Sequence, residues 1–165
     1  MTCRDERVDN ELISTILVTM RSARFPVEPA KLYRECFTFA LRRAARAVSR
    51  KYDEALAPLE LSNGQLTMLA LVAGLGPVRI QKVAEMLVMD RTTVTAALKP
   101  LLRKKLVRIT VAEDDARARD ATLTAAGDAL LRQAMPLWEA QQKVMKVMLS
   151  PVNAEDLRAQ LDRLV

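Results

Sequence analysis

Two short segments in which apolar and polar residues alternate limit the folds open to this chain more than any other feature. Residues 107–113 read VRITVAE, residues 119–123 read RDATL, and DDARA separates them. Alternation with period two is typical of strands that bury one face, and adjacent aspartates favour a turn. We therefore predict a two-stranded hairpin with arginines at its tip. The rest of the chain has helical periodicity, so the predicted fold is mainly α with a small β element.

Helical segments lie on both sides of the hairpin. The prolines of FPVEP and Pro58 bracket a first long helix, Ser62 is a favoured N-cap, and Gly74 and Gly76 favour a helix end. GPVR is predicted as a short strand. Helices are predicted over residues 31–56, 61–75, 80–89, 91–105, 124–149 and 153–165.

The helices predicted over 80–89 and 91–105 are joined by a tight turn and form a helix-turn-helix. Asp90 is the predicted N-cap of the second helix. At about 100° per residue, this helix buries one apolar stripe, made of Val94, Ala97, Leu98, Leu101 and Leu102. The opposite stripe turns outward and contains Thr92, Ala96, Lys99 and Arg103, with Thr93 and Thr95 beside it.

Positive charge is concentrated in the helix-turn-helix and the hairpin. The formal net charge is +6, and the segment from Arg79 to Arg119 holds ten Lys or Arg residues against five Asp or Glu. Basic residues on a hairpin that follows a helix-turn-helix are typical of a wing, whose arginine can enter the minor groove of DNA. A solvated face is the alternative for the helix taken alone. When the basic hairpin is considered together with this helix, double-stranded DNA is the predicted partner.

These segments resemble the multiple antibiotic resistance regulator (MarR) family of winged helix-turn-helix repressors. The resemblance covers residues 32–165 and rests on LRRAARAVSRKYDEAL, on VAEMLVMDRTTVTAALKPLLRKKLV, and on Asp115-x-Arg117 followed by Leu123-Thr124. It implies a homodimer whose first and last helices interlock, a palindromic operator, and release from DNA by a small aromatic or anionic effector, such as a carboxylated one.

The resemblance also assigns roles by position. The wing arginine would be Arg117, oriented by an ion pair with Asp115, and Gln81 and Lys82 would lie at the start of the first helix of the motif. Together with the outward stripe, the predicted DNA-binding residues are Gln81, Lys82, Arg91, Thr92, Thr93, Thr95, Ala96, Lys99, Arg103, Asp115, Arg117 and Arg119.

The sequence departs from the family pattern at four positions. Ala96 stands where many relatives have arginine, and alanine can contact a thymine methyl but cannot bond to guanine. Val88 and Lys105 replace glycines that are common in the family. A β-branched residue tolerates a left-handed backbone poorly, so we expect another turn geometry at Val88. Pro100 removes a backbone donor inside the recognition helix and is expected to bend it.

Two further hypotheses concern regulation. Phe37, Met68 and Trp138 are nominated as effector-binding residues, although aromatic and methionine side chains more often belong to the core. Cys36 could act as a redox sensor, as a cysteine in this helix does in some relatives, but a small core residue is the more common role for such a cysteine. Thiol-based sensing therefore stays open as an alternative function.

The sequence offers little to an enzyme. It has no histidine, no nucleophile with a neighbouring base and no glycine-rich phosphate loop, and no catalytic residue, metal site or cofactor is predicted. The predicted function is that of a DNA-binding transcriptional regulator, a repressor. A winged helix used for protein contact is the alternative from another class.

The predicted organisation has three parts. Residues 1–30 form an N-terminal extension with a short helix, residues 31–60 and 124–165 form a helical dimerisation region, and residues 61–123 form the winged helix-turn-helix. The sequence shows neither a signal-peptide pattern nor an apolar run of membrane-spanning length, so the expected location is the cytoplasm.

Overall fold

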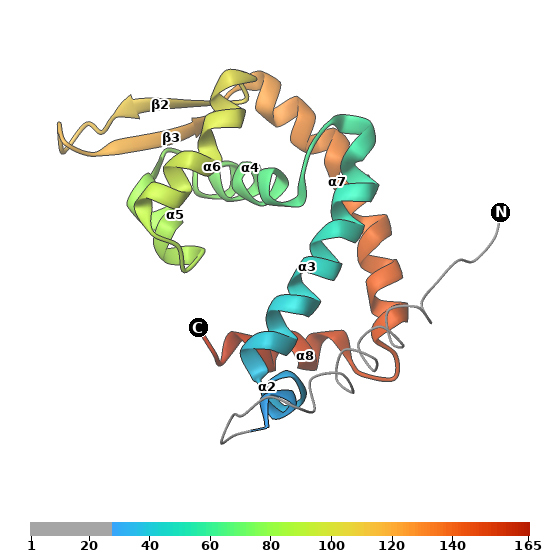
Figure 1. Ribbon diagram of the computed structural model, residues 1–165. Coiled ribbons are helices and arrows are strands. Elements are labelled where there is room, and N and C mark those ends of the chain that lie inside the picture. Colours follow the sequence, from blue (N-terminus) through green and yellow to red (C-terminus); the bar gives the residue numbers. More distant parts are fainter. Residues whose placement is uncertain (1–27) are drawn as a thin grey trace. The chain divides into compact units, whose positions relative to one another are not determined.

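The computed structural model describes residues 28–165, which form parts of two compact units (Figure 1). The first unit is Met1–Ala47 and the second is Val48–Val165. The short helix expected within residues 1–30 lies outside the described residues. None of the helices in residues 28–165 combines the length and the apolarity that crossing a bilayer requires.

The secondary structure follows the predicted order. The helices are α2 (Pro29–Glu35), α3 (Phe37–Leu56), the 3₁₀ turn η2 (Ala57–Leu59), α4 (Asn63–Leu75), α5 (Ile80–Met86), α6 (Arg91–Arg103), α7 (Ala125–Leu149) and α8 (Ala154–Asp162). The strands are β1 (Val78–Arg79), β2 (Val107–Val111) and β3 (Arg119–Leu123).

One helix was predicted where the structure has two. The prediction of a continuous helix over 31–56 is wrong at Cys36, whose backbone is extended with φ −78° and ψ 111° and separates α2 from α3. No proline or glycine marks this break in the sequence. The rings of Tyr33 and Phe39 meet across it edge to face, with their centroids 5.2 Å apart. Side chains six positions apart lie on different faces of a straight helix, so this contact depends on the break.

The second unit is built around a three-stranded antiparallel sheet in the order β1-β3-β2. Val107 pairs with Leu123 and Val111 with Arg119, so β2 and β3 form the predicted hairpin, which extends beyond α5 and α6 (Figure 1). The predicted strand at GPVR exists as β1, in which Val78 pairs with Ala121. This pairing joins the start of α5 to the inner end of the wing.

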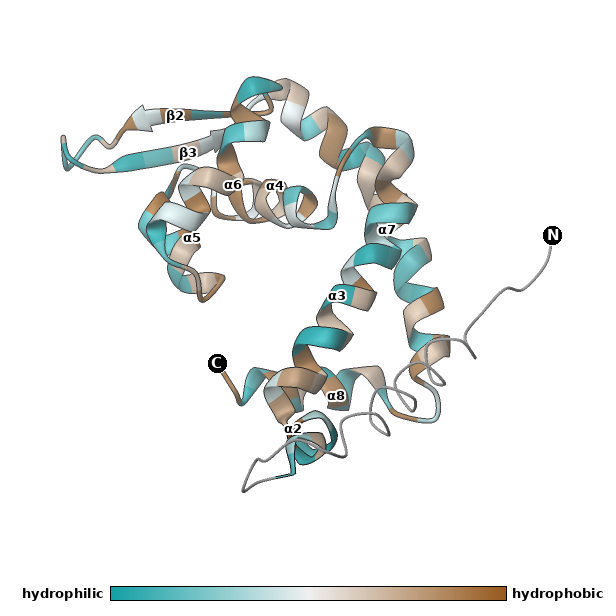
Figure 2. Ribbon diagram, viewed as in Figure 1, coloured by the Kyte–Doolittle hydropathy of each residue, from teal (hydrophilic) through white to brown (hydrophobic). Residues whose placement is uncertain are grey.

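A single apolar core holds α4, α5, α6, the sheet and the first half of α7 together. The predicted buried stripe of α6 is confirmed, since Val94, Leu98 and Leu101 are fully inaccessible and Ala97 and Leu102 are partly buried. The largest fully buried side chains are Leu56, Val72, Leu69, Val83, Val94, Leu98 and Leu101. In Figure 2 the apolar colour follows these inner helices, whereas the loop between β2 and β3 is hydrophilic.

Helix boundaries depend on side-chain caps, and those at Ser62 and Asp90 were predicted. Ser62 and Gln65 form a reciprocal capping box at the start of α4, Asp90 accepts from the Thr93 amide, and Thr124 accepts from the Gly127 amide. Each cap satisfies amides that have no partner within the helix.

The expectation of another turn geometry at Val88 is wrong. Val88 is left-handed with φ 52°, and Lys105 is left-handed with φ 56°. Both stand at the same place in a Schellman ending: Met89 N–H donates to Ala84 O, and the Val88 amide donates to Glu85 O. Completing this hydrogen-bond pattern requires the left-handed residue, so the pattern outweighs the steric cost of a β-branched side chain.

Gly127 is the one glycine of residues 28–165 at which an added Cβ atom would meet other atoms within 4 Å. A Cβ atom added there would lie 2.1 Å from the carbonyl oxygen of Leu106 and 2.8 Å from a methyl of Leu123. The same Leu106 oxygen accepts from the Thr124 amide at 3.0 Å. The first turn of α7 therefore lies against the backbone that leads into β2.

We expect Gly127→Ala to lower the free energy of unfolding by about 1–3 kcal/mol, because the new methyl meets backbone atoms that cannot move aside. Urea denaturation followed by circular dichroism measures this. Gly74→Ala is the matched control, since nothing lies within 4 Å of a Cβ at that position, and it should be neutral or stabilising by up to about 1 kcal/mol. Equal effects of the two substitutions would contradict the packing argument.

Candidate nucleic-acid interface

The outward stripe of α6 is exposed, as the helical periodicity predicted. Thr92, Ala96, Lys99 and Arg103 are all exposed, and so is Arg91 at the first position of the helix. The helix continues through Pro100 to Arg103. The stripe follows from the burial of Val94, Leu98 and Leu101, because one face of a helix cannot be packed without turning the other to solvent.

The three threonines of α6 differ in how free their hydroxyls are. The Thr93 hydroxyl donates to Oδ2 of Asp90, and the Thr95 hydroxyl donates to the carbonyl of Arg91 at 2.8 Å. Thr92 has no such bond within the described residues. The hydrogen bonds from Thr93 also lower the pKa of Asp90, so this cap is ionised at neutral pH. Among the three, Thr92 alone offers a hydroxyl free to donate.

The wing turn is held by backbone hydrogen bonds. The Asp115 carboxylate accepts from the backbone amide of Arg117 at 2.9 Å, and the amide of Ala118 donates to the Asp115 carbonyl at 2.9 Å. The predicted ion pair between Asp115 and the Arg117 side chain is absent from the described structure. Asp115 thus shapes the turn around Arg117 and leaves its guanidinium free.

Arg119 does not lie at the tip of the hairpin. It is the first residue of β3 and pairs with Val111. Its guanidinium donates to the carbonyls of Ala116 at 3.0 Å and Ala118 at 2.8 Å. Arg119 therefore closes the wing turn, and Arg117 is the tip arginine.

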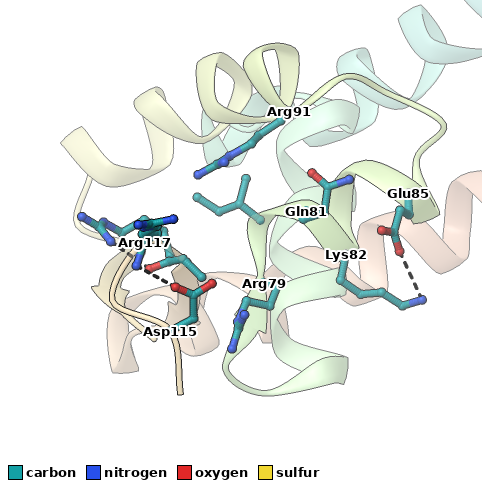
Figure 3. Close-up of a pocket in the computed structure, with 10 residues that line it drawn as sticks. Arg79, Gln81, Lys82, Glu85, Arg91, Asp115 and Arg117 are labelled. Carbon is teal, nitrogen blue, oxygen red and sulfur yellow. Dashed lines mark hydrogen bonds and ion pairs between the residues drawn. The ribbon is translucent and has the colours of Figure 1, made fainter. Parts of the chain in front are cut away.

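A hollow of about 480 Å³ lies between the start of α5, the start of α6 and the wing turn (Figure 3). We call it the wing hollow. It is lined by Arg79, Ile80, Gln81, Lys82, Glu85, Arg91, Asp115, Arg117, Ala118 and Arg119. Five of the ten lining residues are cationic and two are acidic, so the hollow suits an anionic group.

The cations of this face divide into paired and unpaired ones. Lys82 lies 3.6 Å from Glu85, which reduces its charge toward an outside partner. Within residues 28–165, Arg91, Lys99 and Arg117 form no ion pair, and Arg103 forms none either. Their charge is available to a ligand, whereas exposed pairs such as Lys82–Glu85 contribute little to stability.

Sequence reasoning missed Arg79 as a site residue. Its Nε lies 2.9 Å from Oδ1 of Asp120, its strand partner, and its Nη2 pairs with Asp114 of the wing loop. No local pattern in the sequence marks this cluster, since it depends on the register between β1 and β3. The register of β1 and β3 places Arg79 directly opposite Asp120, so a known strand pairing would have identified this residue.

The three nominated effector residues differ in burial and in the unit to which they belong. Met68 is 3% exposed and belongs to the core, which corrects its assignment to a pocket. Phe37 is exposed and belongs to the first unit. Trp138 does line a hollow of about 380 Å³ between α4 and α7, here called the tryptophan pocket. Its lining residues are Asn63, Leu66, Thr67, Ala70, Leu71, Met135 and Trp138.

Cys36 is half-buried at the break between α2 and α3 and lies outside the main core. The expectation of a small core residue is therefore met only in part. Arg34, the nearest cation in sequence, lies 3.2 Å from Glu28.

Comparison with known proteins places this arrangement among DNA-binding regulators. The model of the MarR family matches residues 61–118. The structure is similar to that of the M. tuberculosis transcriptional regulator MosR in complex with DNA, with 34% sequence identity and a TM-score of 0.72. The similarity covers 79% of this chain and 93% of the MosR chain. A sequence search of curated proteins gave no match.

The transcriptional repressor CouR has a similar fold. Its structure bound to a 23-mer DNA duplex has a TM-score of 0.72 at 24% identity and covers 85% of this chain and 99% of that one. Its structure bound to p-coumaroyl-CoA has a TM-score of 0.71 at 23% identity, and the similarity covers 81% of this chain and 94% of the CouR chain.

Proposed function

The chain belongs to the MarR family of DNA-binding transcriptional regulators, which are not enzymes, and on this basis we propose that it is a repressor that binds a palindromic operator as a homodimer. The observation that carries the proposal is the wing hollow, in which Arg91 from α6 and Arg117 from the wing lie free of acidic partners. Two elements far apart in sequence thus present unpaired cations to one anionic partner.

In this proposal α6 lies in the major groove and the wing enters the adjacent minor groove. Lys99 and Thr92 reach base edges or phosphates, and Ala96 contacts a thymine methyl. Gln81 and Lys82, at the start of α5, contact the sugar-phosphate backbone of the DNA. Thr93, Thr95, Arg103, Asp115 and Arg119 complete the interface, with Asp115 and Arg119 acting by shaping the wing turn.

We expect Arg117→Ala to weaken binding to every site with a narrow flanking minor groove, because Arg117 supplies charge and not base recognition. The log–log salt slope should flatten by about one unit for each protomer.

If Lys99 reads a base, Lys99→Ala should make the free energy of DNA binding less favourable by about 1–3 kcal/mol on the best site and by less on mismatched sites. Fluorescence anisotropy on a specific and a scrambled duplex at several salt concentrations measures both.

Arg108→Ala, which removes an exposed arginine of β2 that belongs neither to the proposed interface nor to the proposed dimerisation region, is the control for loss of charge alone. Unchanged affinity and salt slope for Arg117→Ala would refute the wing contact. Binding of another protein with little salt dependence, together with no DNA binding, would favour the alternative of a winged helix used for protein contact.

The dimer is proposed from the apolar surface of α7 and α8. Along α7, Leu130, Ala134 and Leu137 pack on the core, but further along Val144 and Met148 are about half exposed, at 49% and 51%. The terminal residues Leu161 and Leu164 of the α8 segment are exposed as well, at 39% and 70%. Exposed apolar side chains at several positions of two helices are typical of an interface. We propose that residues 31–60 and 124–165 form the dimerisation region.

Leu161→Asp should produce a monomer, or an unstable protein, that binds an operator at least tenfold more weakly, because a buried unpaired carboxylate opposes association. Light scattering and anisotropy measure this. Ala159→Asp adds the same charge on the opposite face of α8 and should keep the dimer. A Leu161→Asp monomer with full DNA affinity would contradict the homodimer.

The effector is proposed to occupy the tryptophan pocket. Five of its seven lining residues are apolar, Asn63 and Thr67 supply polar groups, and no lysine or arginine lines it. This lining favours the aromatic part of a ligand over a carboxylate. CouR is solved with p-coumaroyl-CoA, which contains an aromatic acyl group. The pocket lies against α7, so a ligand there contacts both the lobe and the proposed dimer helix.

Benzoate, salicylate and cinnamate are suitable probes, because Trp138 is the single tryptophan of the chain and reports directly on the pocket. A bound aromatic probe should change the fluorescence emission of Trp138 and lower the affinity for DNA. By linkage, DNA should lower the affinity for the aromatic probe by the same factor. Ala70→Phe, which fills the pocket, should abolish the response. A probe that releases DNA equally well from Ala70→Phe would place the effector site elsewhere.

A further inference from the structure

Arg79 joins three segments of the second unit through one side chain. It lies in β1, directly before α5, and contacts Asp120 at the start of β3 and Asp114 in the loop of the wing. We call this group the Arg79 clasp. A guanidinium has a planar set of five donors and can hold two carboxylates at once, which an ammonium group does with less directional control.

The two halves of the clasp differ in exposure. The side chain of Asp120 is 18% exposed and that of Arg79 is 35% exposed, whereas that of Asp114 is 77% exposed. Oδ1 of Asp120 is buried and has no hydrogen-bond partner of good geometry in the described structure, so the nearby guanidinium is its electrostatic partner. The Asp120 half is thus a fixed anchor at the sheet, and the Asp114 half is a solvent-facing link to the wing loop.

The charge of the clasp argues against a role in holding phosphate. Two carboxylates surround one guanidinium, so the group carries a net charge of −1 beside a hollow in which Arg91 and Arg117 form no ion pair within residues 28–165. Towards a DNA phosphate it contributes repulsion. What the clasp does supply is geometry, since it connects the wing loop to the strand from which α5 begins.

The wing loop is closed internally, but those bonds do not direct it toward the helices. Ala112 N–H donates to Ala118 O at 3.2 Å, and Asp115 holds the amide of Arg117. Both contacts stay within the loop. The Arg79–Asp114 ion pair is the contact from this loop to the segment beside α5.

We propose that Arg79 is a positioning residue for DNA binding: through Asp114 it holds the wing loop so that Arg117 faces the same hollow as Arg91. This inference rests on the proposed function, in which the wing meets DNA. Fixing the loop before binding removes part of the ordering cost that a free loop would incur on contact with DNA.

The test uses a substitution for which charge and geometry predict opposite signs. Asp114→Asn removes a negative charge from a DNA-facing loop, so electrostatics alone would tighten binding. If the clasp positions the wing, Asp114→Asn instead weakens operator binding by about three- to tenfold, summed over two wings. Glu113→Gln is the matched control, because Glu113 is the exposed neighbouring acid and forms no ion pair within residues 28–165; it should bind with unchanged or slightly tighter affinity.

A double-mutant cycle separates positioning from general stability. In the Arg117→Ala background, Asp114→Asn should no longer weaken binding, because the residue that the clasp positions is gone. Hydrogen exchange of residues 112–118 in the DNA-free protein should rise in Asp114→Asn while the melting temperature stays unchanged. Arg79→Lys, which keeps the charge but loses the fork, should show the same increase in exchange.

Two outcomes would overturn the proposal. If Asp114→Asn tightens binding as Glu113→Gln does while Arg117→Ala still weakens it, the clasp does not position the wing and the proposed function stands. If Arg117→Ala has no effect, the wing contact itself fails, and the positioning role fails with it.

Discussion

The burial of one face of α6 is the constraint on which the rest of the molecule depends. Val94, Leu98 and Leu101 are fully inaccessible, and they pack with residues of α4, α5 and the sheet in one core. With that face fixed, the threonine, alanine and lysine stripe has to face outward. Pro100 lies inside this helix without ending it, since α6 continues to Arg103 although proline has no backbone N–H to donate.

The unpaired arginines of the wing hollow come from segments that are far apart in the sequence. Arg91 begins α6, Arg117 lies in the wing turn, and both line one hollow, although 26 positions apart in the sequence. The acids of the same region are largely engaged elsewhere: Asp90 caps α6, Asp115 holds a backbone amide, and Asp114 pairs with Arg79. These acids therefore stabilise local structure, and the unpaired cations remain available to bind a partner. This accounts for the excess of basic over acidic residues in the segment.

Helix α7 connects the DNA-reading lobe to the surface proposed for dimerisation. Its first turn lies against the Leu106 backbone at Gly127, its middle packs on the core through Ala134, and its last turns expose Val144 and Met148. The tryptophan pocket lies against the middle part. A ligand in this pocket would bias the position of one rigid helix on which both the lobe and the proposed partner subunit depend, and such shared elements are how two sites become coupled.

The sequence by itself determined the elements whose signals are local. The caps at Ser62 and Asp90, the buried stripe of α6 and the alternating strands each depend on neighbours within a few positions, and all were predicted correctly. Only the tertiary structure decided the break at Cys36, the left-handed backbone at Val88 and the partners of the wing acids. The break accompanies the contact between the rings of Tyr33 and Phe39, the left-handed backbone completes the hydrogen bonds of a helix ending, and the register of β1 and β3 sets Arg79 opposite Asp120. Such contacts join residues that composition and periodicity do not relate, because their energy exists only once the chain has folded.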